Sequence, residues 1–414
     1  MRYELGNMDR YSIAVMGTVM ENSSFMKAML DETVDADRLM KAVKTALEYH
    51  PLFKCKMSYD KQYYLEDNDN AELILFNVDT HDRPKEYGKN TNGYLFQVCY
   101  FENTVSLEWC HAVTDGRGAS RFFSTVLDSY FGVELPGIPE KFPLSLGYES
   151  IYDKSVKPRS QIKQPAGFRA KDMEVIDNGY KCISHILRVK TDEVLKVTKK
   201  IGVTPSTVLI PLFCRAIREH LPKNAKKRNV SCGIIVDCRK PMKMDTMHNF
   251  VYNKVITYQD KFDSYDLSEL GTIYREILDL FVQPENIIWA CTDMKDSTDF
   301  LYTLRPLKLQ RILMKIVAKI IKRTMNNIGF SYLGRVPFSE KVKSHLKDFD
   351  FRSWTDIGDC VISAADLNGT LILDICENYA DKGVIDSFVS ICKNFEINLE
   401  ETETTIFEQA NLRL

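Results

Sequence analysis

The sequence lacks the patterns that mark several common protein classes. No run of 18 apolar residues occurs, which argues against a hydrophobic membrane-spanning helix. Neither a GxxxxGK[ST] phosphate loop nor a GxGxxG fingerprint is present, so nothing indicates a nucleotide-binding fold of those types. Asp293, Asp296 and Asp299 lack the glycine and the closing glutamate that a calcium-binding EF-hand loop needs.

The chain also lacks an excess of charge of either sign. Its 55 Lys and Arg residues stand against 57 Asp and Glu residues, which gives a net charge of −2 at pH 7. Proteins that bind nucleic acid normally carry a strong basic excess or patch. The near-neutral balance therefore argues against nucleic acid as a partner.

Cysteine is plentiful, but its arrangement excludes a disulfide framework and a zinc site. The chain has 11 cysteines, an odd number, with no CxxC pair and no Cys/His cluster of metal-binding spacing. Most of them lie inside apolar runs, so we expect buried free thiols, no bound metal and a reducing compartment. The start, Met-Arg-Tyr-Glu-Leu-Gly, has no apolar signal-peptide region. The expected location is the cytoplasm.

The length of 414 residues predicts more than one hydrophobic core. Strand and helix patterns alternate in both halves, which indicates an α/β (α+β) chain in two lobes, each a mixed sheet flanked by helices. A stretch rich in Gly, Pro, Lys and Ser runs from about 132 to 180. We therefore expect an N-terminal lobe at 1–150, a connection at 151–180 and a C-terminal lobe at 181–414.

Local patterns predict most of the elements. Strands are expected at 11–16, 24–30, 54–59, 63–66, 73–78, 180–189, 230–238 and 250–258, with a hairpin across Leu367-Asn368-Gly369. Helices are expected from Asp35 to His50, after Gly116, and at 191–201, 204–221, 267–282, 306–325 and 382–399.

The most informative stretch is His111-Ala-Val-Thr-Asp115-Gly116. Two strands joined by a Glu-Asn turn lead into it, and a helical stripe follows it. A histidine held at a strand end before a glycine-bearing turn can face a cavity rigidly, as a general base must. The alternative is a hydrogen-bonded core histidine beside an ordinary Asp-Gly turn.

Several segments together resemble the chloramphenicol acetyltransferase-like acyltransferases, a superfamily that includes alcohol O-acetyltransferases and condensation domains. His111-Ala-Val-Thr-Asp115-Gly116 is similar to the HxxxDG motif of that superfamily. Weaker similarities in the expected order are Tyr49–Phe53, Gly202–Leu209, Ile234–Arg239 with Asn249-Phe250, and Ser331-Tyr-Leu-Gly334. The resemblance spans most of the chain and is nearest the bacterial alcohol acetyltransferase and condensation-like branch.

The resemblance implies roles for particular residues around a tunnel between the lobes. His111 would be the general base, and Asp115 would assist it, chiefly through an ion pair with Arg239. Gly116 would let the backbone turn tightly, and Asn249 would support the site. Ser331 would donate to the oxyanion. Alternatively, Arg239 is an exposed strand-end charge and Ser331 is a loop serine that bonds its own backbone.

The sequence also departs from the pattern of the superfamily. Cys110 stands where condensation domains usually carry a first histidine, and the DFGWG segment of the plant enzymes is absent. Tyr332 stands where the nearest branch commonly has asparagine. These differences weaken the condensation-domain hypothesis and put the role of the Ser331 segment in doubt.

The leading hypothesis is an acyl-CoA-dependent O- or N-acyltransferase that binds acyl-CoA as co-substrate and holds no cofactor. One alternative takes the acyl group from an acyl-carrier protein, and another is a non-catalytic member of the fold. The basic amphipathic segment 312–323 would pack on the core, contact a membrane, or attract coenzyme A phosphates.

Overall fold

The computed structural model describes residues 2–6, 9–10, 23–60, 63–84, 86–137, 147–159, 164–165, 167, 181–306, 308–310, 312–314, 316–317, 328–353, 360–379, 383–408 and 411–413. The expected strand at 11–16 and most of the expected connection at 151–180 lie outside these residues. The same holds for much of the expected helix at 306–325, which includes the basic segment.

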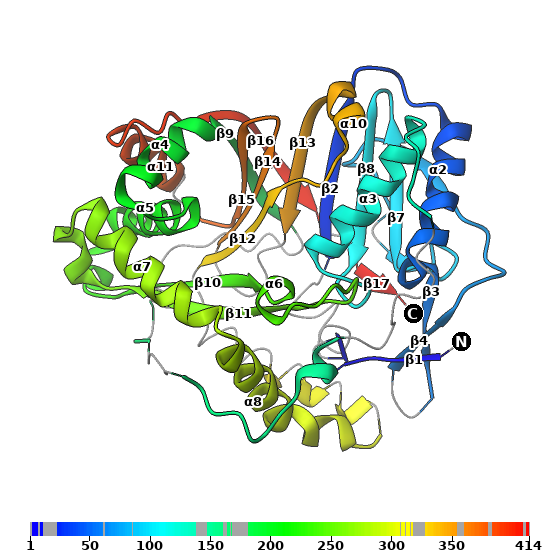
Figure 1. Ribbon diagram of the computed structural model, residues 1–414, viewed down its shortest axis with the longest axis horizontal. Helices are drawn as coiled ribbons and strands as arrows, with labels where there is room; N and C mark the ends of the chain where they lie inside the picture. Colours follow the sequence, from blue (N-terminus) through cyan, green and yellow to red (C-terminus); the bar gives the residue numbers. More distant parts are fainter. Residues whose placement is uncertain are drawn as a thin grey trace.

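The first lobe is built on a five-stranded sheet of order β13-β2-β8-β7-β5. Its strands are β13 (Leu346–Ser353), β2 (Ser23–Leu30), β8 (Thr104–Cys110), β7 (Phe96–Phe101) and β5 (Leu75–Asn77). Helices α2 (Ala36–Tyr49) and α3 (Gly116–Tyr130) pack together against this sheet (Figure 1). Their apolar stripes and the inner face of the sheet form one continuous buried core.

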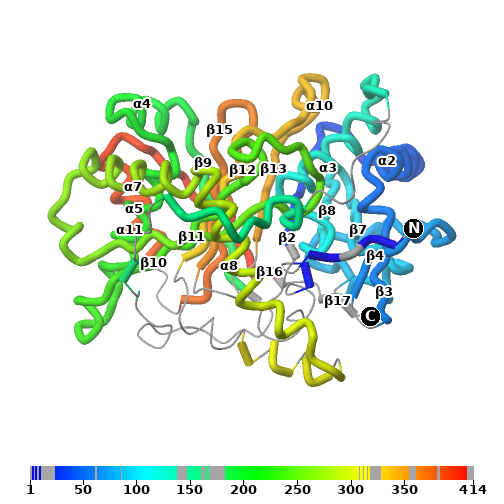
Figure 2. Tube along the Cα trace, turned by 60° about the horizontal axis from the view of Figure 1, so that its bottom comes forward, coloured from blue at the N-terminus to red at the C-terminus, as the bar shows by residue number. Residues whose placement is uncertain are grey.

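Smaller sheets complete this lobe. One contains β1 (Arg2–Glu4), β4 (Tyr63–Asp67) and β3 (Cys55–Tyr59), and the other pairs β6 (Glu86–Gly88) with β17 (Asn411–Arg413). Figure 2 shows that β1 and β17 both lie at the first lobe, so the two ends of the chain come to the same side of the molecule.

The second lobe is built on a seven-stranded mixed sheet of order β11-β10-β12-β14-β15-β9-β16. Its strands are β9 (Lys181–Lys190), β10 (Val230–Asp237), β11 (Val251–Tyr258), β12 (Ile328–Arg335), β14 (Cys360–Leu367), β15 (Thr370–Glu377) and β16 (Glu400–Glu408). The helices of this lobe are α4 (Thr191–Ile201), α5 (Pro205–His220), α7 (Leu267–Phe281), α8 (Pro284–Thr303) and α11 (Gly383–Lys393). Buried side chains of α5, α7 and α11 pack against the sheet in the second core.

Short helices link these elements. They are α6 (Arg239–Met242), α10 (Glu340–His345) and the 3-10 turns Pro51–Lys54, Tyr148–Ile151, Lys223–Ala225 and Asp260–Ser264. The two-lobed α/β architecture predicted from the sequence is thus confirmed. All 11 cysteines are free and buried, also as predicted.

Two strands, β13 and β17, cross the expected division of the chain. β13 lies within the range 181–414 but pairs antiparallel with β2, with Ser353 opposite Ser24 and Phe351 opposite Met26. The residue ranges of the lobes stay a prediction, with the qualification that the first sheet borrows this strand. The pairing of β13 with β2 places β13 between the two sheets, beside the site described next.

Candidate active site

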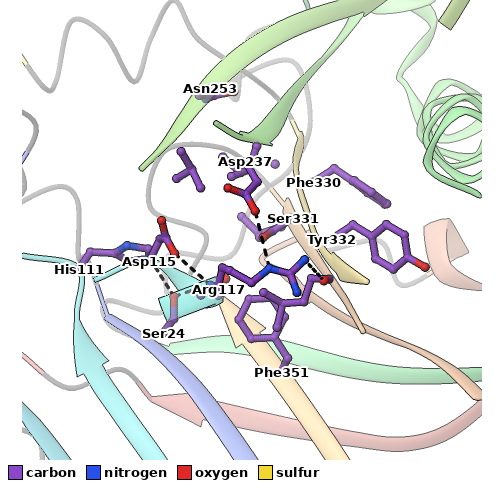
Figure 3. Close-up of a pocket in the computed structure, with 17 residues that line it drawn as sticks. Ser24, His111, Asp115, Arg117, Asp237, Asn253, Phe330, Ser331, Tyr332 and Phe351 are labelled. Carbon is purple, nitrogen blue, oxygen red and sulfur yellow. Dashed lines mark hydrogen bonds and ion pairs between the residues drawn. The ribbon is translucent and has the colours of Figure 1, made fainter. Parts of the chain in front are cut away.

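His111 lies where the sequence predicts it, directly after a central strand. β8 ends at Cys110 and is paired on both sides, by β2 and β7. α3 begins at Gly116, so only the turn 111–115 separates the strand from the helix. The His111 ring borders a cavity, and its Nε2 lies 3.1 Å from Ser24 Oγ on β2 (Figure 3).

The cavity lies between the two lobes. It has a volume of about 190 Å³, which is far more than a single water needs. The first lobe contributes Ser24, His111, Asp115, Gly116, Arg117, Phe351 and Ser353 to its wall, and the second contributes Ile235, Asp237, Val251, Asn253, Gly329 to Leu333, and Val361. A mostly apolar wall with a few polar groups is typical of a site for a small organic group.

Asp115 holds the turn rather than reaching into the cavity. As N-cap of α3, its Oδ1 accepts hydrogen bonds from the backbone N–H groups of Arg117 and Gly118, both at 3.0 Å. Its Oδ2 accepts from the Phe250 N–H at 2.8 Å. The residue is 1% exposed. Because both oxygens are occupied, these contacts favour the structural role for Asp115 over direct participation in the chemistry.

Arg239 supplies the ion pair that the resemblance implies. Its Nη2 lies 2.9 Å from Asp115 Oδ2, and the side chain is buried. The remaining donors reach Asp237 Oδ1 at 3.1 Å, the Thr246 carbonyl at 2.9 Å and the His248 carbonyl at 2.8 Å. The alternative of an exposed strand-end charge is therefore wrong. The pair joins the His111 turn of the first lobe to the end of β10 in the second.

Gly116 of the motif and Gly118, two residues after it, are needed for close packing. The sequence suggests Gly116 as a tight turn, but its φ is not positive and it is the first residue of α3. A Cβ there would lie 3.1 Å from Leu333 and 3.2 Å from Phe351. At Gly118, a Cβ would overlap Thr114 Oγ1 and lie 2.9 Å from the Met247 carbonyl oxygen. Helix α3 therefore approaches its neighbours too closely for a side chain at these positions.

Gly118→Ala is expected to destabilise the protein by about 1–3 kcal/mol, because the added methyl overlaps Thr114 and the Met247 carbonyl group and both must move away from α3. The unfolding free energy in urea measures this. Gly271→Ala in α7 is the matched control: its Cβ would meet nothing closer than 3.4 Å, and it should stabilise by about 0.5–1 kcal/mol. Equal effects of the two substitutions would show that α3 tolerates a side chain at Gly118.

Ser331 lies on a strand and not on a loop as its sequence context suggests. β12 continues through it to Arg335, with an irregularity in pairing after Tyr332. Ser331 borders the cavity, across from His111 in Figure 3. Its hydroxyl makes no hydrogen bond within the part of the chain that the structure describes. It is therefore available as a donor to a group in the cavity.

Asn249 lies against the backbone of the turn that carries His111. Its Nδ2 lies 3.5 Å from the His111 carbonyl oxygen, at the limit of a hydrogen bond. The residue is buried, and its Oδ1 has no partner within the described residues. It is not among the residues that border the cavity.

Two further residues of the site carry no motif. Arg117 donates from Nη2 to the Leu333 carbonyl at 2.6 Å and lies 3.7 Å from Asp237, which ties α3 to the second sheet. Ser24 contacts His111 across 87 positions of sequence. The one local signal for Ser24 is that it continues the buried face of Met26 and Ala28 as a polar residue.

Electrostatics keep the His111 ring neutral at pH 7. Burial lowers the pKa of His111 below its ordinary value of 6.5, and the negative charge of Asp115 offsets this only in part. A neutral imidazole has one nitrogen that accepts a proton. The His111 ring can therefore accept a proton at neutral pH at the edge of the cavity.

Within the described ranges, no cluster of three or more His, Cys, Asp or Glu side chains could hold a metal ion. In the same residues, no single helix is long and apolar enough to cross a membrane. The bent pair α4 and α5 meets the length and composition test together, although α5 is mostly buried within the core.

Comparison of the sequence with family models and with curated proteins finds no match. Comparison of the structure finds many. Polyketide synthase associated protein 5 from Mycobacterium tuberculosis is 12% identical with a TM-score of 0.66, over 95% of this chain and 98% of that one. The condensation domain of the monacolin K polyketide synthase MokA is 13% identical with a TM-score of 0.63, over 96% and 97%. The chain therefore has the chloramphenicol acetyltransferase-like fold.

A third structure with this fold is TRI101 of F. sporotrichioides, solved in complex with coenzyme A and T-2. It is 8% identical to this chain, with a TM-score of 0.63, and the match covers 97% of this chain and 99% of that one. The chloramphenicol acetyltransferase-like fold thus extends over nearly the whole described length. At these identities the comparisons show the fold alone.

Proposed function

We propose that the protein is an acyltransferase that moves an acyl group from acyl-CoA to a hydroxyl or amine acceptor. The observation that carries the proposal is the placement of a neutral, cavity-facing His111 between the lobes, on a turn held by the buried Asp115–Arg239 pair. The fold is shared with TRI101, which was solved with coenzyme A, and that likeness supports coenzyme A as the carrier of the acyl group.

The proposed reaction is a single transfer through a tetrahedral intermediate. His111 Nε2 takes the proton of the acceptor O–H or N–H while the acceptor attacks the thioester carbonyl carbon. The C–S bond then breaks, and His111 returns the proton to the leaving thiolate. The hydroxyl of Ser331 is suited to stabilise the oxyanion, because it borders the same cavity with its donor unused.

The rate is expected to rise with pH through an acid limb whose midpoint lies below 6.5, and to level off above it. The sign follows from burial, which disfavours the charged imidazolium and lowers the pKa of His111, so the active neutral form persists below 6.5. The pH profile of kcat/KM, which reports groups of the free enzyme, measures this midpoint. A midpoint well above 6.5 would contradict a buried, neutral base.

The main alternative to this proposal concerns the identity of the acyl donor. Condensation domains share the fold, so an acyl-carrier protein is a second candidate donor. Cys110 in place of the first histidine of those domains favours coenzyme A. A non-catalytic member of the fold is the third candidate, and retention of His111, Asp115, Gly116 and Arg239 in one connected site speaks against it.

The test is release of free thiol from acetyl-CoA, longer acyl-CoAs and an acyl-carrier protein, each with pooled alcohols and amines. Acceptor-dependent release from acyl-CoA is expected. Release with acyl-carrier protein but not with acyl-CoA would show that the carrier protein is the acyl donor, in the same type of reaction. The absence of release from every donor would favour the non-catalytic alternative.

A further inference from the structure

A serine hydroxyl lies against Nε2 of His111. Ser24 Oγ lies 3.1 Å from Nε2, within hydrogen-bond distance. Ser24 is 3% exposed and lies on β2, an inner strand of the first sheet. The backbone of β2 pairs with β13 on one side and with β8 on the other. The contact is therefore built into the sheet.

In the tautomer of the neutral imidazole that carries its proton on Nδ1, Nε2 has a single lone pair and can accept one hydrogen bond in the ring plane. While Ser24 donates to Nε2, neither a water nor an acceptor can give its proton to His111. The hydroxyl has the size of the water molecule it replaces. A nucleophile that gives its proton to Nε2 must first displace this hydroxyl.

We propose that Ser24 is a specificity-determining residue that keeps water off His111 and so suppresses hydrolysis of the bound thioester. The inference rests on the proposed acyl transfer. Hydrolysis would follow the same steps: water attacks the carbonyl carbon, its proton passes to Nε2, the C–S bond breaks, and the thiolate takes the proton. The products are a carboxylic acid and a free thiol.

An acceptor displaces Ser24 where water does not, because the acceptor contributes binding energy along the cavity wall and water contributes none. Ser24 also has a second partner to turn to. Ser353, its register partner on β13, places Oγ 3.4 Å from Ser24 Oγ and borders the same cavity. The Ser24 hydroxyl is already placed to donate to Ser353 Oγ, so turning its single proton from His111 to Ser353 leaves the lone pair of Nε2 without a donor.

The substitution Ser24→Ala leaves room for one water against Nε2, with Ser353 Oγ as a second polar partner. We expect the ratio of acyl-CoA hydrolysis to acceptor acylation to rise about fivefold, the population change that one neutral hydrogen bond corresponds to. Ser24→Thr keeps a hydroxyl and a strand-compatible side chain and should restore slow hydrolysis. A general loss of packing would lower both rates without changing their ratio.

Three outcomes would overturn the inference: an unchanged ratio in Ser24→Ala, loss of all turnover in that variant, or an acyl adduct on the peptide that contains Ser24. The last two would make Ser24 an obligatory or covalent participant. A measurement independent of turnover is nitrogen-15 NMR of the His111 ring. The inference requires an unprotonated Nε2 at neutral pH, and a proton on Nε2 would make Ser24 an acceptor and contradict it.

The same experiments separate this inference from the proposed function. Acyl transfer by the wild type with an unchanged ratio in Ser24→Ala leaves the function intact and rejects the role of Ser24. The absence of thioester turnover in the wild type rejects the function, and the protonation of Nε2 still decides whether Ser24 donates to it.

Discussion

His111→Ala is expected to lower the rate of acyl transfer by about 10²–10⁴-fold, the usual contribution of a positioned general base. Without the imidazole, the acceptor keeps its proton during attack, and the thiolate leaves without receiving one. Stability should change little, because the His111 ring borders a cavity and so has fewer packed neighbours to lose. Steady-state kcat/KM and the urea midpoint measure the two effects.

His220→Ala is the matched control for the loss of an imidazole. His220 ends α5 in the second lobe, where its Nε2 lies 2.9 Å from Ser387 Oγ. The residue is not among those that border the cavity. Its replacement should leave kcat/KM within about twofold of the wild type, since general-base assistance is lost only at His111. A similar loss of rate in both variants would show that His111 is not the general base.

Arg239→Ala is expected to destabilise the protein by about 3–5 kcal/mol. The substitution leaves the Asp115 carboxylate buried without its cationic partner, and an unpaired buried charge is strongly unfavourable. The loss should also lower the transfer rate, because the turn that carries His111 is anchored to the second lobe through this pair. Equilibrium unfolding in urea measures the first effect.

Arg121→Ala is the control for Arg239→Ala. Arg121 lies in α3 and pairs with Asp245, and the two side chains are 35% and 71% exposed, far more than Arg239 and Asp115. Exposed pairs contribute about 0–1 kcal/mol. A cost for Arg239→Ala no larger than that for Arg121→Ala would show that the Asp115 pair is not essential. Asp115→Asn, which keeps an acceptor for the α3 N–H groups, should cost less than Asp115→Ala.

Local sequence patterns predict those helices, strands and turns that are determined by residues close together in the chain. The strand, the turn and the Asp115-capped helix around His111 follow from periodicity and capping rules, and the structure contains each of them. The Asn368-Gly369 turn between β14 and β15 is another case. Both residues have positive φ, at 51° and 79°, as a type I′ hairpin requires.

Local patterns fail where a distant partner decides the outcome. β13 joins β2 across more than 300 positions, and nothing in either segment specifies the other. Ser24 reaches His111 only because β2 and β8 pair, so no motif could include it. The sequence prediction also omits α8 and β16. The glutamates of β16 disfavour a strand by composition, and pairing with β9 overrides that preference.

The most direct test of the account follows a labelled acyl group from acyl-CoA in a single turnover. The wild type is mixed with equimolar labelled acyl-CoA, an acceptor is then added, and label is counted on coenzyme A, protein and acceptor. The account predicts that label passes from coenzyme A to the acceptor only after the acceptor is added, never rests on the protein, and stays on coenzyme A in His111→Ala. Label on the protein, or equal transfer by the wild type and His111→Ala, would contradict it.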